Sequence, residues 1–574
     1  MTQHLADRTE PNGPGTESRP DWWRDAVIYQ VYPRSFADGD GDGMGDLSGI
    51  RSRLPYLAEL GVDAVWLSPF YASPQADAGY DVADYRAIDP MFGDLHDADA
   101  LIRDAHDLGL RIIVDLVPNH SSDRHEWFQR ALRQGPGSPL RDRYHFRPGK
   151  GTDGELPPND WESIFGGPAW TRTTNPDGTP GEWYLHLFAP EQPDLNWDNQ
   201  AVHDEFRSVL RFWLDMGVDG FRIDVAHGLI KEAGLPDMGQ SGQLRMLGTD
   251  VLPFFDQDGV HEIYRSWRKI LDEYPQQRIA VAEAWTPTAE RTALYVRPDE
   301  LHQAFNFHYL NTPWGADELR QVIDSSLDSM RPVGAPTTWV LSNHDVVRHR
   351  TRLGGSLARA RAATLLMLAL PGSAYLYQGE ELGLPEVVDL PDEVRQDPAF
   401  FRRAGHHDDA DDGQDGLRDG CRVPIPWTAQ GSSFGFGDGG SWLPQPPAWG
   451  KLSVAAQAGD PAATLELYRA ALAIRRTQPA LGAGDGVEWL ATPPGVLAFR
   501  RRSACGGTSL GAPPGRSPGE ESGGNTAVVC AVNTTDKPVE LPDVLTPGGS
   551  RLLASGPWPA GTVLPADTTV WWGE

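Results

Sequence analysis

The sequence predicts a (β/α)8 TIM barrel with a small domain inserted after the third barrel strand and an all-β domain at the C-terminus. Three observations support this prediction. Short strand-like segments alternate with helical ones until eight strands have passed, a stretch without clear periodicity follows the third strand, and the C-terminal residues contain strands without long helices between them. Alternation of this kind favours a parallel sheet. A doubly wound sheet is the alternative, but no glycine-rich phosphate loop opens a predicted helix.

The first part of the predicted barrel precedes residue 121. Strands are expected at 26–36, 64–67 and 111–117, and helices at 50–60 and 100–108. The segment 111–117 is apolar almost throughout, as is typical of a strand that is buried on both faces. Gly109 stands where a helix C-cap glycine belongs.

Residues 121–190 interrupt this rhythm, because they are rich in Gly, Pro and aromatic residues and show little periodicity. We interpret them as an inserted domain, called domain B. The barrel resumes with a helix at 204–216, whose apolar residues share one face, and with a fourth strand that begins at Gly220. Further strands are expected at 278–283, 304–309, 337–341 and 374–377, and further helices at 288–296, 317–330, 357–370 and 462–475.

The predicted domain boundaries follow from this pattern. Residues 1–20 form a disordered tail, 21–120 and 191–480 the barrel, 121–190 domain B, and 481–574 a C-terminal β-sandwich domain. Strands of the last domain are expected at 487–500, 526–532 and 568–572. A low-complexity stretch rich in Gly, Pro and Ser predicts a disordered loop at 506–525.

The acidic composition limits the classes of partner. Asp and Glu number 80 against 50 Lys and Arg, which gives a formal net charge of -30. This charge repels nucleic acid and anionic membranes, so a neutral or cationic small molecule is the expected partner, although acidity also serves solubility. The three cysteines form no zinc or disulfide pattern, and neither a signal peptide nor a membrane-spanning stretch is visible. We therefore expect a cytoplasmic protein that is a monomer or homo-oligomer.

Polar residues follow several predicted strands, at the ends where a β/α barrel builds its active site. A polar residue at the end of one strand is common. Random placement would, however, scatter such residues among loops and helices, and here they follow four strands. Carboxylates and imidazoles without a cysteine nucleophile, a phosphate loop or a zinc cluster indicate glycoside hydrolysis. The residues, from the third, fourth, fifth and seventh strands, are Asp115, Asn119, His120, Arg222, Asp224, His227, Glu283, Asn343, His344 and Asp345.

Two of these carboxylates have different surroundings. Arg222 and Asp224 are two residues apart, so on a strand they point the same way. A neighbouring guanidinium lowers the pKa of a carboxylate, which suits a nucleophile, and a purely structural Arg–Asp pair is the alternative. Glu283 lies between two alanines and is followed by a tryptophan, a less polar setting that suits a proton donor.

Four segments, 115–120, 220–224, 283–285 and 343–345, resemble the four signature regions of the α-amylase family, in order and at the ends of the predicted strands. The segment 192–197 (QPDLNW) resembles an additional motif of the α-glucosidase and oligo-1,6-glucosidase branch. The resemblance covers about residues 21–574, apart from the low-complexity loop.

The resemblance implies a role for each motif residue. Asp224 would be the nucleophile and Glu283 the general acid/base of a retaining mechanism. Asp345 would grip sugar hydroxyls and favour a distorted, oxocarbenium-like ring. Three further residues would bind the same sugar or orient the nucleophile: His120, His344 and Arg222.

Two further stretches, 79–85 and 418–424, build the substrate pocket in such enzymes. By the resemblance, Tyr80 would stack on the terminal sugar, and Asp81 would form hydrogen bonds with the far hydroxyl groups of that sugar. Arg422 would face Asp81 across the closed end of the pocket, and a pocket closed by a charged pair admits one terminal residue. Phe165 and Phe188 are candidates for the pocket walls or for plain core.

Residues 38–46 (DGDGDGMGD) resemble the first part of a calcium-binding hand, because oxygen ligands recur at alternate positions. Gly49 stands where the bidentate Glu of such a hand belongs, and related glucosidases usually carry Asn at the position of Asp40. We expect a structural Ca²⁺, with a flexible acidic turn as the alternative. The predicted ligands are Asp38, Asp40, Asp42, Met44 (through its carbonyl) and Asp46.

The expected activity is that of a retaining, exo-acting α-glucosidase that releases terminal glucose from short α-glucosides through a glucosyl–Asp224 intermediate. An oligo-1,6-glucosidase, a glucosyltransferase or isomerase that converts trehalose or sucrose, and a non-catalytic relative are the alternatives. In some relatives Val after the nucleophile accompanies α-1,6 activity, as Val225 would here. We associate the following Ala226 and His227 with α-1,4 enzymes, and we favour α-1,4.

Overall fold

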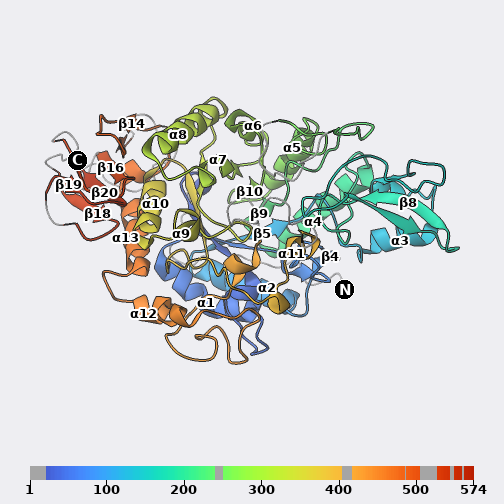
Figure 1. Cartoon of the computed structure of the whole chain (residues 1–574), viewed down its shortest axis with the longest axis horizontal. Coiled ribbons are helices and arrows are strands. Elements are labelled where there is room, and N and C mark those ends of the chain that lie inside the picture. The colour runs from blue at the N-terminus through green and yellow to red at the C-terminus, as the bar shows by residue number, and fades with distance from the viewer. Residues whose placement is uncertain are drawn as a thin grey trace.

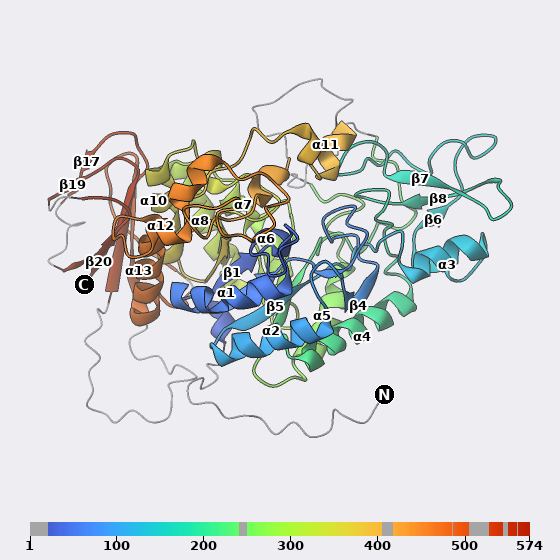
Figure 2. The same cartoon turned by 90° about the horizontal axis from the view of Figure 1, so that it is seen from below.

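The computed structural model describes residues 21–239, 250–403, 417–484, 486–503, 527–542, 549–558 and 561–574. The predicted tail 1–20 and the predicted loop 506–525 lie outside the described residues. The barrel occupies the middle of the molecule, with the residues of domain B at one end and the C-terminal sheet at the other (Figure 1). The view turned by 90° gives the same arrangement (Figure 2).

Eight parallel strands form the central sheet, in the order β11-β10-β9-β5-β2-β1-β13-β12. Their bounds are β1 (Val27–Val31), β2 (Ala64–Leu67), β5 (Arg111–Leu116), β9 (Gly220–Ile223), β10 (Ile279–Ala282), β11 (Gln303–Ala304), β12 (Thr338–Val340) and β13 (Ser373–Tyr377). A parallel bridge between Phe305 and Thr338 joins the two ends of this order, so the sheet closes. The predicted barrel is confirmed.

The helices that follow the strands cover the outside of the barrel (Figure 1). Local signals set their ends: Asp46 caps the first helix by accepting from Gly49 N–H at 2.6 Å, and Gly217, with φ of 112°, ends the helix before β9. The main helices are α1 (Leu47–Leu60), α2 (Leu95–Asp107), α4 (Gln200–Met216), α5 (Val260–Leu271), α6 (Ala289–Leu294), α8 (Ala316–Met330), α10 (Leu357–Ala369) and α13 (Thr464–Thr477).

Three predicted strands are wrong in extent. The strand expected at 26–36 ends at Val31, and a 3-10 helix, η2 (Pro33–Ser35), follows it. The strand expected at 304–309 ends at Ala304, and α7 (Phe307–Leu310) follows, because Asn306 caps that short helix by accepting from Tyr309 N–H at 3.0 Å. A short apolar run fits a strand and a helix equally well, and here the cap decides. The strand expected at 487–500 is two strands, β14 (Glu488–Trp489) and β15 (Val496–Arg502), since two prolines and Gly495 (φ 77°) turn the chain between them.

The segment between β5 and α4 contains a helix and an antiparallel three-stranded sheet. The helix is α3 (Glu126–Gln134), and the strands are β6 (Phe146–Arg147), β7 (Trp170–Thr174) and β8 (Pro180–Leu185). The sequence predicted none of these elements. A short hairpin, β3 (Tyr71–Ala72) with β4 (Asp84–Ile88), follows β2. The helix α11 (Pro398–Arg403) reaches domain B, where Arg402 donates to the Gly166 carbonyl at 2.8 Å.

The C-terminal sheet is antiparallel, in the order β14-β15-β16-β20-β18, beside a two-stranded pair of β17 (Val539–Glu540) and β19 (Val563–Leu564). The further strands are β16 (Ala527–Asn533), β18 (Arg551–Ala554) and β20 (Thr568–Gly573). Strand β20 packs on α10, where Thr569 donates to the Ala362 carbonyl at 2.7 Å. Among the described residues, no helix combines the length and the apolar character that a bilayer crossing requires.

Candidate active site

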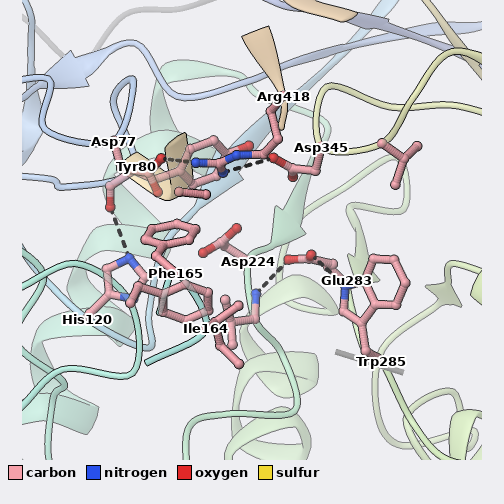
Figure 3. A pocket seen from close by; sticks show the side chains of 14 residues that line it. Asp77, Tyr80, His120, Ile164, Phe165, Asp224, Glu283, Trp285, Asp345 and Arg418 are labelled. Carbon is pink, nitrogen blue, oxygen red and sulfur yellow. Dashed lines mark hydrogen bonds and ion pairs between the residues drawn. The ribbon is translucent and has the colours of Figure 1, made fainter. Parts of the chain in front are cut away.

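A pocket of about 200 Å³ lies at the ends of the barrel strands, where the chain leaves β2, β5, β9, β10 and β12. Asp224, Glu283 and Asp345 all line it, and Figure 3 shows their carboxylates around the same space. Residues of domain B, among them Phe165, complete the wall. The structure therefore brings the three predicted catalytic carboxylates into one cavity.

Arg222 holds the carboxylates at the base of the pocket. Its Nη1 lies 2.5 Å from Asp224 Oδ1 and 3.0 Å from Asp115 Oδ1, and its Nη2 lies 2.8 Å from Glu283 Oε2. The guanidinium is 1% exposed, so water does not screen these ion pairs. Arg222 was predicted to orient Asp224 alone, but its two terminal nitrogens bind both Asp224 and Glu283.

The electrostatics differ from the expectation for Asp224. Burial raises its pKa, and the charges of Glu283 and Asp115 act in the same direction against the lowering effect of Arg222. Burial also raises the pKa of Asp115 to about 7. Three carboxylates share one guanidinium, so Arg222 alone does not balance their charge, and the pKa values of Asp224 and Asp115 are raised together. A nucleophile and an acid that work together need one ionised and one protonated carboxyl group, so their joint action depends on this shared counter-charge.

The two oxygens of Glu283 are fixed by donors from two loops. Val225 N–H donates to Oε2 at 2.9 Å, and the indole Nε1 of Trp285 donates to Oε1 at 2.9 Å. Val225 has a φ of 43°, which is a strained conformation for a β-branched residue. This strain directs the amide that follows Asp224 toward Glu283.

The charged pair that lines the pocket is a different one from the pair predicted. Arg418 Nη2 lies 2.7 Å from Asp77 Oδ1, and both residues line the pocket. The predicted pair, Asp81 and Arg422, does not face the cavity. Asp81 is 0% exposed and accepts from the backbone amides of Ala76 and Asp77, at 2.9 and 3.0 Å. Its side chain is used within its own turn, so the prediction is corrected to Asp77 and Arg418.

Asp345 is surrounded by positive charge. Its Oδ1 lies 2.9 Å from Arg422 Nη2 and 3.2 Å from Arg418 Nη1, and its Oδ2 lies 3.1 Å from His344 Nε2. Burial opposes ionisation, but His344 and the two arginines together lower the pKa of Asp345 below its usual range. Arg422 thus acts on the pocket through Asp345. A carboxylate that stays ionised suits the predicted grip on sugar hydroxyls.

The two predicted histidines lie at different depths. His120 lines the pocket, with Nε2 3.1 Å from the Tyr80 carbonyl, and burial lowers its pKa to about 4, so its ring is neutral. His344 lies behind the wall: Nε2 is 2.7 Å from the Tyr80 hydroxyl, and Nδ1 is 2.7 Å from Gln30 Nε2. A direct bond from His344 to a sugar would have to replace its contact with Tyr80.

The predicted aromatic residues all line the cavity. Tyr80 stacks on His344 with ring centroids 5.3 Å apart and planes 3° apart, which fixes its plane. Phe188 packs edge-on against Phe165, with centroids 5.5 Å apart. Both phenylalanines are therefore wall residues and not merely core.

Sequence reasoning missed three polar side chains that line the pocket: Asp77, Trp285 and Arg418. Asp77 lies four residues before Asp81, and nothing in the sequence said which of the two carboxylates turns inward. Arg418 and Trp285 stand inside motifs that were recognised, yet neither residue was assigned a role. Only the close packing of segments from different strands reveals their positions.

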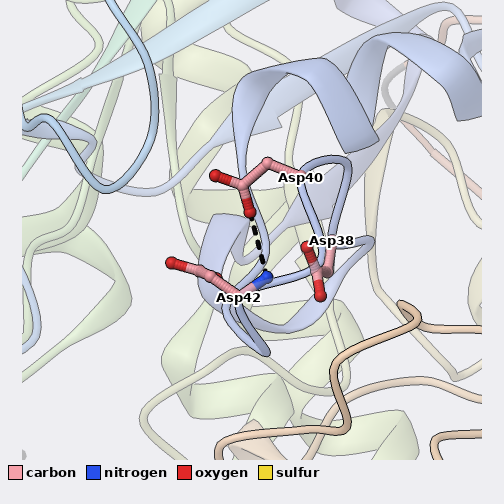
Figure 4. Close-up of side chains that lie close together, drawn as sticks. All are labelled: Asp38, Asp40 and Asp42. Atoms are coloured by element: carbon pink, nitrogen blue, oxygen red, sulfur yellow. Dashed lines mark hydrogen bonds between the residues drawn. The ribbon is translucent and has the colours of Figure 1, made fainter.

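The predicted metal loop directly precedes α1, and Figure 4 shows the side chains of Asp38, Asp40 and Asp42 close together in it. Carboxylate oxygens of Asp38, Asp40 and Asp42 lie within 4.8 Å of one another. Asp46 does not belong to this group, and its carboxylate accepts from Gly49 N–H at 2.6 Å and from Gly39 N–H at 2.8 Å, so its role as a ligand stays a prediction. Ligation by the Met44 carbonyl stays a prediction.

A second segment, which contains Phe436 and Gly439, packs against this loop. The Asp38 amide donates to the Phe436 carbonyl at 2.8 Å. A Cβ atom at Gly439 would lie only 1.9 Å from the Gly41 carbonyl, so only glycine permits this approach. Oxygen ligands arranged in this way suit a hard cation such as Ca²⁺.

Comparison with known proteins agrees with this geometry. The family model described as "Alpha amylase, catalytic domain" matches residues 30–484. A probable alpha-glucosidase of Rhizobium meliloti is 37% identical over 555 residues, which cover 91% of this chain and 91% of that protein. An oligo-1,6-glucosidase of Parageobacillus thermoglucosidasius is 36% identical over 484 residues, or 79% of this chain and 84% of its own length.

A solved structure extends the similarity to the whole described fold. The crystal structure of the alpha-glucosyl transfer enzyme XgtA superposes with a TM-score of 0.81 at 36% sequence identity. The match covers 96% of this chain and 99% of that one. The similarity to that enzyme therefore includes both the barrel and the all-β C-terminus.

Proposed function

The chain belongs to the α-amylase family, in its glucosidase branch, and is a glycoside hydrolase; from this premise we propose that it is a retaining, exo-acting α-glucosidase. Its substrates would be short α-glucosides, from which it would release the glucose at the non-reducing end. One observation supports this proposal best: Arg222 forms ion pairs with both Asp224 and Glu283, in a pocket that the ion pair of Asp77 and Arg418 also lines.

The proposed reaction has two steps. Asp224 Oδ1 is held by Arg222, which leaves Oδ2 to attack the anomeric carbon. Glu283 protonates the glycosidic oxygen while the bond from that oxygen to the anomeric carbon breaks. Water then attacks the anomeric carbon, gives its proton to Glu283, and displaces Asp224. Two inversions leave the released glucose in the α configuration.

The exo action would follow from the closed end. The Asp77–Arg418 pair and Asp345 face a terminal sugar, and Tyr80 and Phe165 offer it flat apolar surfaces. A cavity of about 200 Å³ suits one sugar residue and not an internal stretch of polymer. For the bond cleaved we propose α-1,4, with α-1,6 as the alternative, and Val225 lines the pocket beside that bond.

Glucosyl transfer is the second candidate, because the similar crystal structure belongs to a glucosyl transfer enzyme. In that reaction a hydroxyl group of an acceptor, and not water, would attack the glucosyl–Asp224 intermediate. Hydrolysis and transfer share every residue proposed so far. The ratio of the two products at high sugar concentration separates them.

We also propose a structural Ca²⁺ at the loop of Asp38, Asp40 and Asp42. The ion would neutralise the three carboxylates and fix the loop that precedes α1, with no part in the reaction. A reducing compartment such as the cytoplasm is our proposal for the location, and the buried free thiols of Cys421 and Cys530 are compatible with it.

One substrate panel tests the proposed function. Maltose, isomaltose, sucrose and trehalose are each incubated with the enzyme, and released glucose is scored, with Asp224→Ala as the inactive reference. We expect glucose from maltose first. No glucose from any of the four with the wild-type protein would contradict the proposal, and glucose from isomaltose alone would change the linkage.

A further inference from the structure

The indole of Trp285 makes two contacts that the proposed mechanism does not yet use. Its Nε1–H donates to Glu283 Oε1 at 2.9 Å, and its ring stacks on Phe307 with centroids 3.8 Å apart and planes 4° apart. Trp285 lines the pocket on the side away from Asp77 and Arg418 (Figure 3). It therefore stands where the leaving group of a terminal glucoside would lie.

The two carboxyl oxygens of Glu283 have unequal partners. Oε2 accepts from Val225 N–H at 2.9 Å and pairs with Arg222 Nη2 at 2.8 Å, whereas Oε1 accepts from Trp285. A proton on Oε2 would point at a guanidinium and replace a charge-assisted bond, which is stronger than a neutral one. The proton that Glu283 gives away therefore resides on Oε1, beside the indole.

From this arrangement, and resting on the proposed function, we infer that Trp285 is a positioning residue that turns Glu283 Oε1 toward the leaving group and favours release of its proton. A hydrogen-bond donor stabilises the ionised form of a carboxylate, so the indole N–H stabilises the Glu283 carboxylate that proton transfer leaves behind. In the first step the proton passes from Oε1 to the glycosidic oxygen, the bond from that oxygen to the anomeric carbon breaks, and Asp224 bonds to that carbon. The stack on Phe307 fixes the indole plane for this contact.

The other ionisable groups near Glu283 do not depend on the indole. Arg222 and Asp224 come from the end of β9, Asp115 from β5, and Asp345 from the opposite wall of the pocket. The ring of His227 faces the backbone of Glu283, and burial lowers its pKa to about 3, so it is neutral. Removing the indole N–H therefore changes one bond against a constant charge background.

The test uses two substrates with different needs for a proton. A disaccharide that the enzyme cleaves must have its leaving oxygen protonated, whereas α-glucosyl fluoride loses fluoride without that help. Trp285→Phe keeps a ring over Phe307 and removes the N–H. We expect kcat/KM for the disaccharide to fall about tenfold and that for the fluoride to fall less than about twofold. The pH profile of kcat/KM for the disaccharide should also differ from that of the wild type on its basic limb, because the lost bond is to the group that gives up the proton.

Trp314→Phe is the matched control. It removes an indole bond of the same length, 2.9 Å to Asp567 Oδ1, away from the pocket, and should change neither rate nor profile. Trp285→Tyr takes the place of Trp285→Phe if that variant does not fold. An equal loss on both substrates with an unmoved basic limb would overturn the inference alone. A wild-type enzyme that cleaves neither substrate would overturn the proposed function, and the inference with it.

Discussion

The pocket and the loop at 38–42 both gather carboxylates, but they neutralise them in different ways. In the pocket, Arg222 and Arg418 lie within 3.2 Å of the acids they serve. In the loop, Asp38 and Asp42 accept from backbone amides, at 2.6 Å from Gly41 and 2.7 Å from Met44. An amide carries only a partial charge, so the loop leaves most of its negative charge for a cation, whereas the pocket carries its own counter-charges.

This difference explains why the two regions suit different tasks. Buried arginines fix which carboxyl group is ionised, and a nucleophile and a proton donor require that control. The loop is exposed at Asp40 and Asp42, so a metal can enter from solvent and the carboxylates can rearrange around it. The predictions below change one side of this comparison at a time.

The largest effect is expected at the base of the pocket. Asp224→Ala removes the proposed nucleophile, so we expect kcat for an α-glucoside to fall by a factor on the order of 10⁴ or more. Steady-state release of glucose measures it. Asp104→Ala changes an exposed carboxylate paired with Arg51 and should leave kcat unchanged. A rate for Asp224→Ala near that of the wild type would remove Asp224 from the mechanism.

The next effect separates the two candidate pairs at the closed end. Asp77→Asn weakens the ion pair with Arg418 and a bond to the sugar, and we expect kcat/KM to fall by a factor of about 100. Asp81→Asn is the matched control, because its side chain serves the backbone. It should lower the melting temperature and spare kcat/KM. The reverse ranking would restore the original prediction of Asp81.

A third prediction concerns Glu380, a buried carboxyl group that forms no ion pair with an arginine among the described residues. Glu380 Oε2 lies 4.0 Å from His349, and burial raises the pKa of Glu380 to about 8. In the unfolded chain this carboxyl group ionises near pH 4 to 5. Between that pH and about pH 8, the folded state therefore holds one proton more than the unfolded chain. Stability should therefore fall as pH rises toward about 8, by at most about 1.4 kcal/mol per pH unit, and level off above it.

Glu380→Gln removes that titration. We expect its melting temperature to depend less on pH than that of the wild type between about pH 6 and about pH 9. Other buried groups that titrate in this window, such as Asp115 and Glu386 with pKa values raised to about 7, are present in both proteins, so the difference between the two proteins reports on Glu380. Parallel melting curves for the two proteins would mean that Glu380 is already ionised in the folded state.

The smallest effect is expected at the metal loop. Dialysis against EDTA should lower the melting temperature by a few degrees and leave kcat per folded molecule unchanged, because the ion would be structural. Added Ca²⁺ should restore the melting temperature. The triple variant Asp38→Asn, Asp40→Asn, Asp42→Asn should show no response to EDTA. An unchanged melting temperature together with a blank metal analysis of the native protein would rule out the site.

Local sequence signals predicted the elements well where one state was strongly favoured. The strand at 64–67 has the predicted bounds, and the helix at 357–370 differs by one residue. Prediction failed where a local contact decided between two states, as at Asn306, whose cap turns an expected strand into a helix. The helix at Glu126–Gln134 was missed in a stretch that Gly and Pro dominate overall.

The residues of the candidate site were likewise predictable only in part. Asp224, Glu283 and Asp345 could be found because each follows a strand within a recognisable motif. Asp77 could not be distinguished from Asp81, because the choice depends on which carboxylate accepts from the backbone amides of its own turn. The raised pKa of Asp224 could not be predicted either, since it depends on burial and on charges from other strands.

The configuration of the first glucose released tests the central claim most directly. Proton NMR can follow an α-glucoside during the first turnovers, before the released sugar mutarotates. Attack by Asp224 followed by attack of water predicts α-glucose as the first product. β-Glucose would mean a single displacement by water, and the role of Asp224 as the covalent nucleophile would be wrong.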